Sequence, residues 1–311
     1  MEVYQDIKNV VRQPEAVLTV GSFDGLHLGH QFVLEELKAR SRAVGAMSTL
    51  VTFKPHPKFV IGGGEDPDFR VLTTIAEKIN ILESLGLERL VVVPFTEEFA
   101  KTSAEEFIES ILFERIGFKE IIVGYDHAFG RNREGNSDTF RRLGTKLNFA
   151  VTELEAVRGD DTEISSTEIR RLLHEGRVEN VMSKLGRYYF MIGSVVKGEG
   201  RGAEFGFPTA NLELGDEKKL VPANGVYAVL VSLEGKKYKG MMNIGVRPTF
   251  DETQKISEVH IFDFDRRIYT RKLKVEFVQK IRNEQRFDGA SKLVGQLKLD
   301  KIKSVQILSN C

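Results

Sequence analysis

The stretch Gly21-Ser22-Phe23-Asp24-Gly25-Leu26-His27-Leu28-Gly29-His30 directly follows the apolar run Ala16–Val20 and opens the amphipathic segment His30–Ser41. An apolar run, a glycine-rich turn and a helical pattern in that order are typical of a strand–turn–helix unit. Three glycines within nine positions let the backbone approach a ligand closely. Because the first turn of a helix has free N–H groups and the positive end of the helix dipole, this stretch predicts a phosphate site.

The same alternation continues outward from this stretch through the first half of the chain. Helical spacing of apolar residues occurs in Thr73–Leu85 and Ala104–Arg115. Alternating strands and helices predict a parallel, doubly wound, Rossmann-like sheet with right-handed crossovers. Such sheets bind ligands at the carboxyl ends of their strands. The further predicted strands are Ser48–Phe53, Arg89–Val93, Glu120–Val123 and Phe149–Glu153.

The pattern changes after about Lys184, where strands follow one another without helices and are separated by Gly and Pro. This predicts antiparallel pairing in a small β-barrel, closed by a C-terminal helix at about Ser291–Leu308. We expect a short helical linker in Arg177–Gly186, and therefore domains at 1–183 and 184–311. The predicted barrel strands are Tyr188–Val196, Gly225–Leu233, Tyr238–Ile244, Val259–Phe264 and Leu273–Ile281.

Composition narrows the class of protein. A chain of 311 residues suits two domains. Forty-five basic residues balance forty-five acidic ones, which gives no support to nucleic-acid binding as the main activity. The single cysteine, Cys311, excludes a disulfide framework or a Cys-ligated zinc within one chain. No apolar run could span a membrane and the N-terminus lacks a secretory h-region, so we expect a cytoplasmic protein.

His27 and His30 are three residues apart, on one side of the first helical turn. An imidazole can donate hydrogen bonds to phosphate oxygens as charge moves onto a departing pyrophosphate, so positioning and charge stabilisation would be sufficient for such a transfer. The stretch has no Lys and is not a P-loop. The alternative is a glycine turn with two incidental histidines, or a metal site.

The segment Ile164–Arg170 (ISSTEIR) follows the fifth predicted strand. Alone it is an ordinary helix start, with hydroxyl caps followed by an acidic residue. Because it follows a strand of the sheet, its helix should also begin on the carboxyl side. There, hydroxyl groups, free N–H groups and Arg170 could hold a triphosphate opposite the two histidines.

In the second half, Gly198-Glu199-Gly200-Arg201-Gly202 precedes Gly206-Phe207-Pro208-Thr209-Ala210-Asn211. A loop with glycine at every second position can fold over phosphates. Thr209 and Asn211 offer neutral oxygens on the same side of an extended segment, which suits Mg²⁺. The alternative is a turn in which these side chains satisfy their own backbone.

Together, the segments 21–30 and 164–170 resemble the H-x-G-H nucleotidyltransferases, in particular the FMN adenylyltransferase module of bacterial bifunctional FAD synthetases. Thr52-Phe53-x-Pro55-His56-Pro57 and Val123-Gly124-x-Asp126-x-x-Phe129-Gly130 extend the resemblance. It implies that His27 and His30 bind ATP phosphates and stabilise the transition state. It further implies nucleotide or phosphate contacts from Gly21, Phe23, Asp24, Gly29, Ser165, Ser166, Thr167 and Arg170.

The same resemblance implies that Asp126 and its neighbours contact flavin or nucleotide. His56 is also expected to contact flavin, although a structural corner between two prolines is an equal alternative. The family commonly has Phe where this chain has His127, which leaves the stacking environment beside Asp126 open.

The second half resembles riboflavin kinase in the order of its motifs, including Asn243-Ile244-Gly245-x-Arg247-Pro248-Thr249-Phe250 and Glu258-Val259-His260. The resemblance implies that Thr209 and Asn211 bind Mg-ATP and that Glu258 is the general base. Without it, Glu258 could not be preferred to Glu276 or Glu284. It also implies nucleotide contacts from Gly198, Gly200, Arg201 and Gly202, and a flavin contact from Arg247.

The sequence therefore predicts a bifunctional enzyme that uses Mg²⁺ and ATP to convert riboflavin to FMN and FMN to FAD. Its expected partners are these small molecules, with no nucleic acid and no membrane. One rival is transfer of a nucleotidyl group to another phosphate by the first domain. A second is a flavin-storing or RNA-binding protein that has lost the chemistry. The oligomeric state stays open, with transient self-association one alternative.

Overall fold

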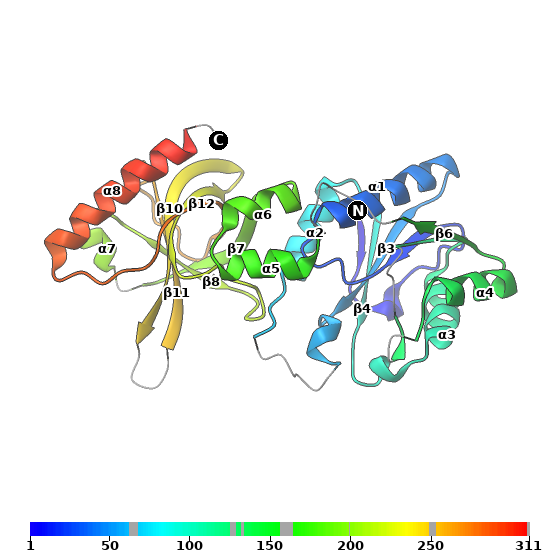
Figure 1. Cartoon of the computed structure of the whole chain (residues 1–311). Coiled ribbons are helices and arrows are strands. Elements are labelled where there is room, and N and C mark those ends of the chain that lie inside the picture. The colour runs from blue at the N-terminus through cyan, green and yellow to red at the C-terminus, as the bar shows by residue number, and fades with distance from the viewer. Residues whose placement is uncertain are drawn as a thin grey trace. The chain divides into compact units, whose positions relative to one another are not determined.

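The structure is a computed structural model that describes residues 1–61, 68–124, 129–131, 134–155, 164–198, 200–248 and 253–309. The chain forms two compact units, Met1–Ile164 and Ser165–Cys311 (Figure 1). These are unit 1 and unit 2. Cys311 lies outside the described residues.

Unit 1 contains a six-stranded parallel sheet with the strand order β1-β4-β3-β2-β5-β6. The five predicted strands are confirmed to within one or two residues; β1 was not predicted. From β2 the chain moves outward to β3 and β4 on one side, and then to β5 and β6 on the other. The order therefore reverses between β2 and β5. The strands are β1 (Glu2–Tyr4), β2 (Val17–Val20), β3 (Ser48–Lys54), β4 (Arg89–Pro94), β5 (Glu120–Gly124) and β6 (Ala150–Leu154).

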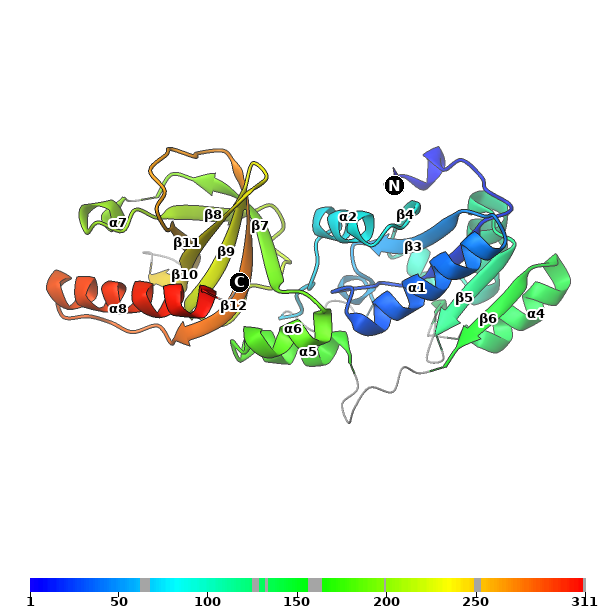
Figure 2. The ribbon, with the colours of Figure 1, turned by 90° about the horizontal axis from the view of Figure 1, so that it is seen from above.

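Helices cover both faces of this sheet (Figures 1 and 2). Helices α1 and α2 lie on one face, and α3, η4 and α4 on the other. The helix predicted at 104–115 is present, but it continues from Phe107 as a π-helical segment. The elements are η1 (Ile7–Asn9), α1 (Leu28–Ala43), η2 (Pro57–Phe59), α2 (Ile75–Ser84), η3 (Phe99–Lys101), α3 (Ala104–Glu106), η4 (Phe107–Ile116) and α4 (Ser137–Leu147).

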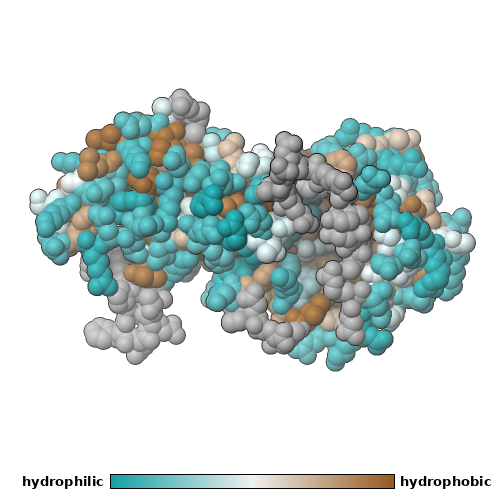
Figure 3. Space-filling model, in the orientation of Figure 1, coloured by the Kyte–Doolittle hydropathy of each residue, from teal (hydrophilic) through white to brown (hydrophobic). Residues whose placement is uncertain are grey.

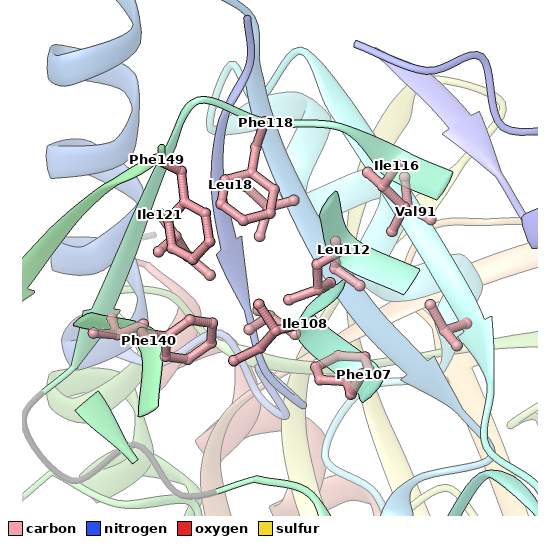
Figure 4. Close-up of a cluster of buried hydrophobic side chains, with 14 of the residues drawn as sticks. Leu18, Val91, Phe107, Ile108, Leu112, Ile116, Phe118, Ile121, Phe140 and Phe149 are labelled. Atoms are coloured by element: carbon pink, nitrogen blue, oxygen red, sulfur yellow. The ribbon is translucent and has the colours of Figure 1, made fainter. Parts of the chain in front are cut away.

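The core of unit 1 lies between the sheet and η4 with α4 (Figure 4). Leu18 and Ile121 project from β2 and β5 toward Ile108 and Leu112 of η4, and Phe140 of α4 completes the cluster. Each fully buried aliphatic or aromatic side chain contributes about 1.5–3 kcal/mol. This packing fixes β2, and with it the start of the glycine–histidine turn.

Unit 2 is a closed barrel with the strand order β10-β11-β8-β7-β12-β9, in which all pairs are antiparallel. The predicted barrel and its C-terminal helix are confirmed, whereas β8 was not predicted. The elements are α5 (Ser166–His174), α6 (Val178–Leu185), β7 (Tyr189–Val196), α7 (Arg201–Glu204), β8 (Ala210–Leu214), β9 (Gly225–Leu233), β10 (Lys236–Pro248), β11 (Thr253–Ile261), β12 (Lys272–Arg282) and α8 (Ala290–Leu308).

The predicted helical linker is present as α6, and both α5 and α6 belong to the same compact unit as the barrel. The carbonyl oxygen of Leu173 accepts a hydrogen bond of 3.0 Å from the Ala223 N–H. Val178, Val181 and Leu185 of α6 are buried. The boundary between the two activities, placed at 183/184 from the sequence, stays a prediction.

The face drawn in Figure 3 is mostly polar, with small apolar areas. One of these lies over α8, where Leu299, Ile302 and Val305 are exposed. Among the described residues, no helix combines the length and apolar character needed to cross a membrane.

Candidate active sites

The turn between β2 and α1 has an unusual backbone. Phe23, Gly25 and Leu26 have φ angles of 44°, 83° and 45°. Glycine adopts such angles freely, but bulky residues such as Phe and Leu do so at a cost of about 1–3 kcal/mol each. The turn therefore needs contacts from elsewhere to hold it in this shape. It begins at the carboxyl end of β2, at the point where the strand order reverses.

Asp24 supplies one of these contacts. Its buried carboxylate accepts hydrogen bonds of 3.0 Å from the backbone N–H groups of Leu72 and Thr73. The Thr73 hydroxyl donates to the same carboxylate at 3.2 Å and accepts from the Gly25 N–H at 3.1 Å. Asp24 thus fastens the turn to the start of α2. Its predicted contact with the nucleotide stays a prediction.

The two histidines lie together at the start of α1. His27 is the N-cap residue, and its Nδ1 accepts a hydrogen bond of 3.3 Å from the His30 N–H. The two rings stack at a centroid distance of 3.7 Å, and the Phe23 ring lies 4.8 Å from that of His30. Because Nδ1 of His27 accepts, a neutral His27 ring has its proton on Nε2. That N–H can donate to an anion.

The charge state of His30 is set by its surroundings. Desolvation of the ring is the largest cause that lowers the pKa of His30 well below its ordinary value, and the charges of His27 and Lys78 lower it further. His30 is therefore neutral at pH 7. Within the described part of the chain, its buried Nδ1 has no hydrogen-bond partner.

Lys78 of α2 was not predicted as a site residue. Its Nζ donates to the Ser22 carbonyl oxygen at 2.5 Å and to the Thr52 hydroxyl at 3.0 Å. Burial lowers the pKa of Lys78 to about 8, although the charge of Asp24 opposes this shift. The sequence contains one signal: Lys78 lies at helical spacing from Ile75 and Leu82, on the apolar stripe of α2.

The glycines predicted in the turn lie where little space is left. A Cβ atom on Gly21 would lie 3.1 Å from the Phe23 ring, and one on Gly29 would lie 3.3 Å from the His27 ring. The carbonyl oxygen of Ile164, the last residue of unit 1, lies 4.0 Å from that second position. Ile164 therefore lies beside the turn.

The remaining residues of the Ile164–Arg170 segment belong to unit 2. Ser165 is the N-cap of α5, and its hydroxyl accepts a hydrogen bond of 3.2 Å from the Glu168 N–H. The helix start expected from the sequence is thus present. The phosphate contacts predicted for Ser165, Ser166, Thr167 and Arg170 stay predictions.

His56 and Asp126 are the two flavin contacts predicted in unit 1. His56 caps η2, where its Nδ1 accepts from the Lys58 N–H at 3.2 Å, and its ring lies 4.9 Å from that of Phe69. These contacts suit the structural alternative, while the flavin contact stays a prediction. Asp126 and the neighbouring His127 lie outside the described residues.

In unit 2, one pocket brings together four of the predicted site residues: Gly200, Gly202, Thr209 and Glu258. Its apolar lining suits an aromatic ring system, whereas its polar groups could hold phosphate and hydroxyl groups. The other lining residues are Phe205, Phe207, Val226, Met241, Asn243, His260, Arg282, Glu284, Gln285, Phe287, Leu293 and Leu297.

The position of Glu258 bears on the choice of a general base. It lies on β11, where the strand register sets it opposite Asn211 of β8 and Asn243 of β10. Glu284 also lines the pocket and accepts a hydrogen bond of 3.2 Å from the Asn224 side chain. Glu276 forms an ion pair of 2.9 Å with Lys274 and is not among the lining residues. The pocket therefore favours Glu258 or Glu284 over Glu276.

The glycines of the loop lie against the predicted ligands. A Cβ atom on Gly198 would collide with the Asn211 side chain, and one on Gly202 would lie 3.3 Å from the Thr209 hydroxyl. A Cβ atom on Gly202 would also collide with the Phe207 carbonyl oxygen, so glycine is needed at both positions. Glu199 and the side chains of Arg201 and Arg247 lie outside the described part of the structure, so the contacts predicted for the two arginines stay predictions.

His260 is a second residue whose role the sequence did not predict. Its Nδ1 lies 2.7 Å from the Pro208 carbonyl oxygen, which can only accept, so Nδ1 carries the proton. Burial is the main cause that lowers the pKa of His260 below its ordinary value. The neutral ring thus holds the backbone just before Thr209.

Of the two residues predicted to hold a metal ion, Thr209 lines the pocket, whereas Asn211 is not among its lining residues and lies opposite Glu258 in the strand register. Thr209 and Asn211 offer neutral oxygens, which suit Mg²⁺ that keeps waters and nucleotide phosphates among its ligands. The described residues contain no cluster of three His, Cys, Asp or Glu side chains that could hold a metal by themselves. The donor set therefore fits Mg²⁺ that arrives with a nucleotide.

A histidine–glycine turn at the reversal point of a parallel sheet, followed by a barrel pocket lined by glycines and carboxylates, defines a two-module class of phosphate-handling transferases. The first module matches the family model for FAD synthetase over residues 10–168. The second matches that for riboflavin kinase over residues 185–308. The chain belongs to the bifunctional riboflavin kinase/FMN adenylyltransferase family.

Similar proteins extend over nearly the whole chain. The bifunctional riboflavin kinase/FMN adenylyltransferase of Bacillus subtilis is 37% identical over 302 residues, which cover 96% of this chain and 94% of that protein. The protein of the same description from Escherichia coli K12 is 33% identical, with coverage of 97% and 96%. A crystal structure from Streptococcus pneumoniae, described as a macrolide-efflux protein, has 31% identity, a TM-score of 0.87 and 97% coverage of both chains.

Proposed function

We propose that this chain phosphorylates riboflavin to FMN in the barrel pocket and transfers AMP from a second ATP to FMN at the histidine turn. The observation that carries the proposal is the stacked pair His27–His30 at the strand-order reversal, in the same chain as the Glu258 pocket. The product of the second module is the substrate of the first, which gives a reason for their fusion.

In adenylyl transfer, a phosphate oxygen of FMN forms a bond to the α-phosphorus of ATP, and the bond from that phosphorus to the bridging oxygen of pyrophosphate breaks. Negative charge develops on the α-phosphate oxygens and on the leaving group. The Nε2–H of His27 and the neutral ring of His30 can donate hydrogen bonds to these oxygens. Free N–H groups of the first turn of α1 add to this stabilisation.

In riboflavin phosphorylation, the 5′-oxygen of the ribityl chain forms a bond to the γ-phosphorus of ATP, and the bond to the bridging oxygen of ADP breaks. The hydroxyl must lose its proton as this happens. Glu258 is the proposed acceptor of that proton. The apolar lining, which includes Phe207, Met241 and Leu297, suits the flavin ring.

The proposal includes Mg²⁺, which neutralises polyphosphate charge when it is bound. Thr209 and Asn211 are the residues that would hold it with ATP in the barrel. A cytoplasmic location is part of the proposal because both reactions consume ATP.

One assay tests the function and separates its rivals. The chain is incubated with riboflavin and Mg-ATP, and the flavins are separated by chromatography. We expect FMN early and FAD later, with one pyrophosphate released for each FAD. FMN without FAD would point to a different acceptor for the first module. The absence of both products would favour a binding protein.

A further inference from the structure

Lys78 lies beneath the histidine turn as a buried ammonium group. Its side chain is 4% exposed, and Nζ donates to the Ser22 carbonyl oxygen and the Thr52 hydroxyl. Thr52 donates in turn to the same carbonyl oxygen at 3.1 Å. Both hydrogen-bond acceptors that the structure assigns to Nζ are neutral. Among the residues that the structure describes, Lys78 is thus a buried positive charge that donates no hydrogen bond to a carboxylate.

Another buried lysine of unit 1 provides a comparison. Lys38 of α1 is 8% exposed, and its Nζ forms an ion pair of 2.7 Å with Glu35. It also donates to the Leu85 carbonyl oxygen. Burial of an ammonium is compensated best by an ionised partner, so the two lysines are not equivalent. Holding the charge of Lys78 in place opposes folding, which points to a role other than stability.

The contacts of Lys78 determine the geometry at the start of the turn. A peptide group is planar and almost always trans, so its carbonyl and N–H point in opposite directions. Since the Ser22 carbonyl is directed toward Lys78 and Thr52, the N–H of Phe23 is directed away from them. Lys78 therefore fixes the first peptide of the turn, while Asp24 fixes its middle through Leu72 and Thr73.

We propose that Lys78 is a positioning residue for adenylyl transfer: its ammonium fixes the Ser22–Phe23 peptide and places a positive charge directly behind the turn. This inference rests on the function proposed for unit 1. The turn itself contains no lysine, so α2 supplies the charge from outside the motif. Such a charge stabilises the negative charge that develops when pyrophosphate departs.

The titratable groups that act on one another here come from the turn and from α2. His27 acts on His30 from the same turn, Lys78 acts on His30 from α2, and Asp24 acts on Lys78 from the turn. The positive charge of Lys78 helps to keep His30 neutral. Loss of this charge should therefore raise the pKa of His30.

The test uses the full chain and four variants. Lys78→Met removes the charge and keeps the length of the side chain. Lys78→Arg keeps a charge that does not titrate, and Thr52→Val removes the hydroxyl but leaves the ammonium. Lys38→Met is the matched control at a buried lysine away from the turn. FAD formation from FMN and Mg-ATP is measured from pH 5.5 to 9.5, with riboflavin phosphorylation as an internal check.

We expect Lys78→Met to lower kcat for adenylyl transfer by about 10–100-fold, the usual effect of a misplaced or uncharged site. Thr52→Val should lower this kcat several-fold or less, and Lys38→Met should leave it nearly unchanged. In the unmodified chain, the rate should fall as the pH rises through about 8, because Lys78 then loses its proton. That alkaline fall should be absent in both Lys78 variants, and NMR titration should show a higher pKa for His30 in Lys78→Met.

The outcomes separate a positioning role from a structural one. A normal rate and an unchanged pH profile in Lys78→Met would overturn the inference. So would a loss of activity that follows a lowered melting temperature and leaves both the alkaline fall and the His30 titration unchanged. If Lys78→Met does not fold, the test uses Lys78→Arg and Thr52→Val instead, and the quantity compared is the alkaline fall of the adenylyl-transfer rate. If the unmodified chain makes no FAD, the proposed function fails, and the His30 titration still decides whether Lys78 acts on that ring.

Discussion

The turn of unit 1 and the pocket of unit 2 present different residues for the two proposed reactions. The turn gathers His27, His30 and Lys78, and its carboxylate, Asp24, is occupied by backbone N–H groups. The pocket has carboxylates on its lining, Glu258 and Glu284. The phosphate of FMN is already ionised when it attacks, so adenylyl transfer needs stabilisation of charge but no base. In riboflavin phosphorylation, by contrast, a hydroxyl must lose a proton, and this step requires a base.

We expect the largest effect on activity in the double variant His27→Ala/His30→Ala, which tests the role of the histidines in the turn. FAD formation should fall by more than about 10³-fold, because donors to the developing charge are lost together. FMN formation should remain nearly normal, since that chemistry belongs to the barrel. Both are measured by chromatography of the flavins. Normal FAD formation by the double variant would remove the histidines from the mechanism.

A change of Glu258 to Gln tests the other site. Gln keeps the size and a hydrogen-bonding group but cannot take the proton, so kcat for FMN formation should fall by about 10²–10⁴-fold. The KM values for riboflavin and Mg-ATP should change much less. FAD formation from supplied FMN should be unaffected.

Two other carboxylates serve as controls for this assignment. Glu284→Gln changes a second carboxylate of the pocket, and Glu276→Gln changes one that pairs with Lys274 outside the lining. We expect a modest loss in the first and almost none in the second at saturating substrates. A larger loss in Glu284→Gln than in Glu258→Gln would reverse the assignment of the base.

Fragments of the chain can locate the boundary between the two activities more precisely. Fragment 185–311 lacks α5 and the buried face of α6, which includes Val178 and Val181. At about 1.5–3 kcal/mol for each buried apolar side chain, it should be less stable than fragment 165–311 by several kcal/mol. Chemical unfolding measures this difference, and riboflavin phosphorylation shows whether each fragment keeps its site.

The complementary fragments address the phosphate contacts predicted in α5. Fragment 1–164 retains the turn but lacks Ser165, Ser166, Thr167 and Arg170. It should fold and fail to make FAD, whereas 1–183 should retain some activity. Equal FAD formation by both fragments would exclude these four residues from the reaction.

The smallest expected effect is a loss of stability in acid. The pKa values of His30 and His260 are both lowered by burial, so the unfolded chain takes up protons near pH 6.5 and the folded chain only at lower pH. The free energy of unfolding should therefore fall as the pH drops below about 6.5, by roughly 1 kcal/mol per histidine for each pH unit.

Thermal melts between pH 5 and 7.5 measure this effect. His260→Gln retains a donor for the Pro208 carbonyl oxygen and should flatten the dependence of the unit 2 transition only. An unchanged slope in this variant would mean that another group titrates.

Most of the secondary structure could be predicted because each unit has a regular apolar pattern. Strand Gly225–Leu233, for example, is found within the bounds predicted for it. β1 was missed because three residues at a sheet edge are too few to show a recognisable apolar pattern. β8 was missed because Ala210–Leu214 begins within a motif for which an extended segment and a turn were both left open. The π-helical geometry of η4 depends on packing in the core, which no local spacing encodes.

The proximity of His27 and His30 could be predicted because the two residues are only three positions apart in the sequence. Contacts between distant residues were not predictable. Asp24 reaches Leu72 across 48 positions, and Lys78 reaches Ser22 across 56. His260 meets Pro208 only because the barrel brings β11 beside the segment before β8.

The left-handed turn at Phe23, Gly25 and Leu26 has a consequence for protein design. Its shape is imposed by groups that are distant in the sequence, namely Thr52 on β3 and the segment Leu72–Lys78. A ten-residue graft of Gly21–His30 onto another parallel sheet would relax to a different backbone. The smallest transferable part is β2 with its turn and α1, together with Thr52 and the first turns of α2.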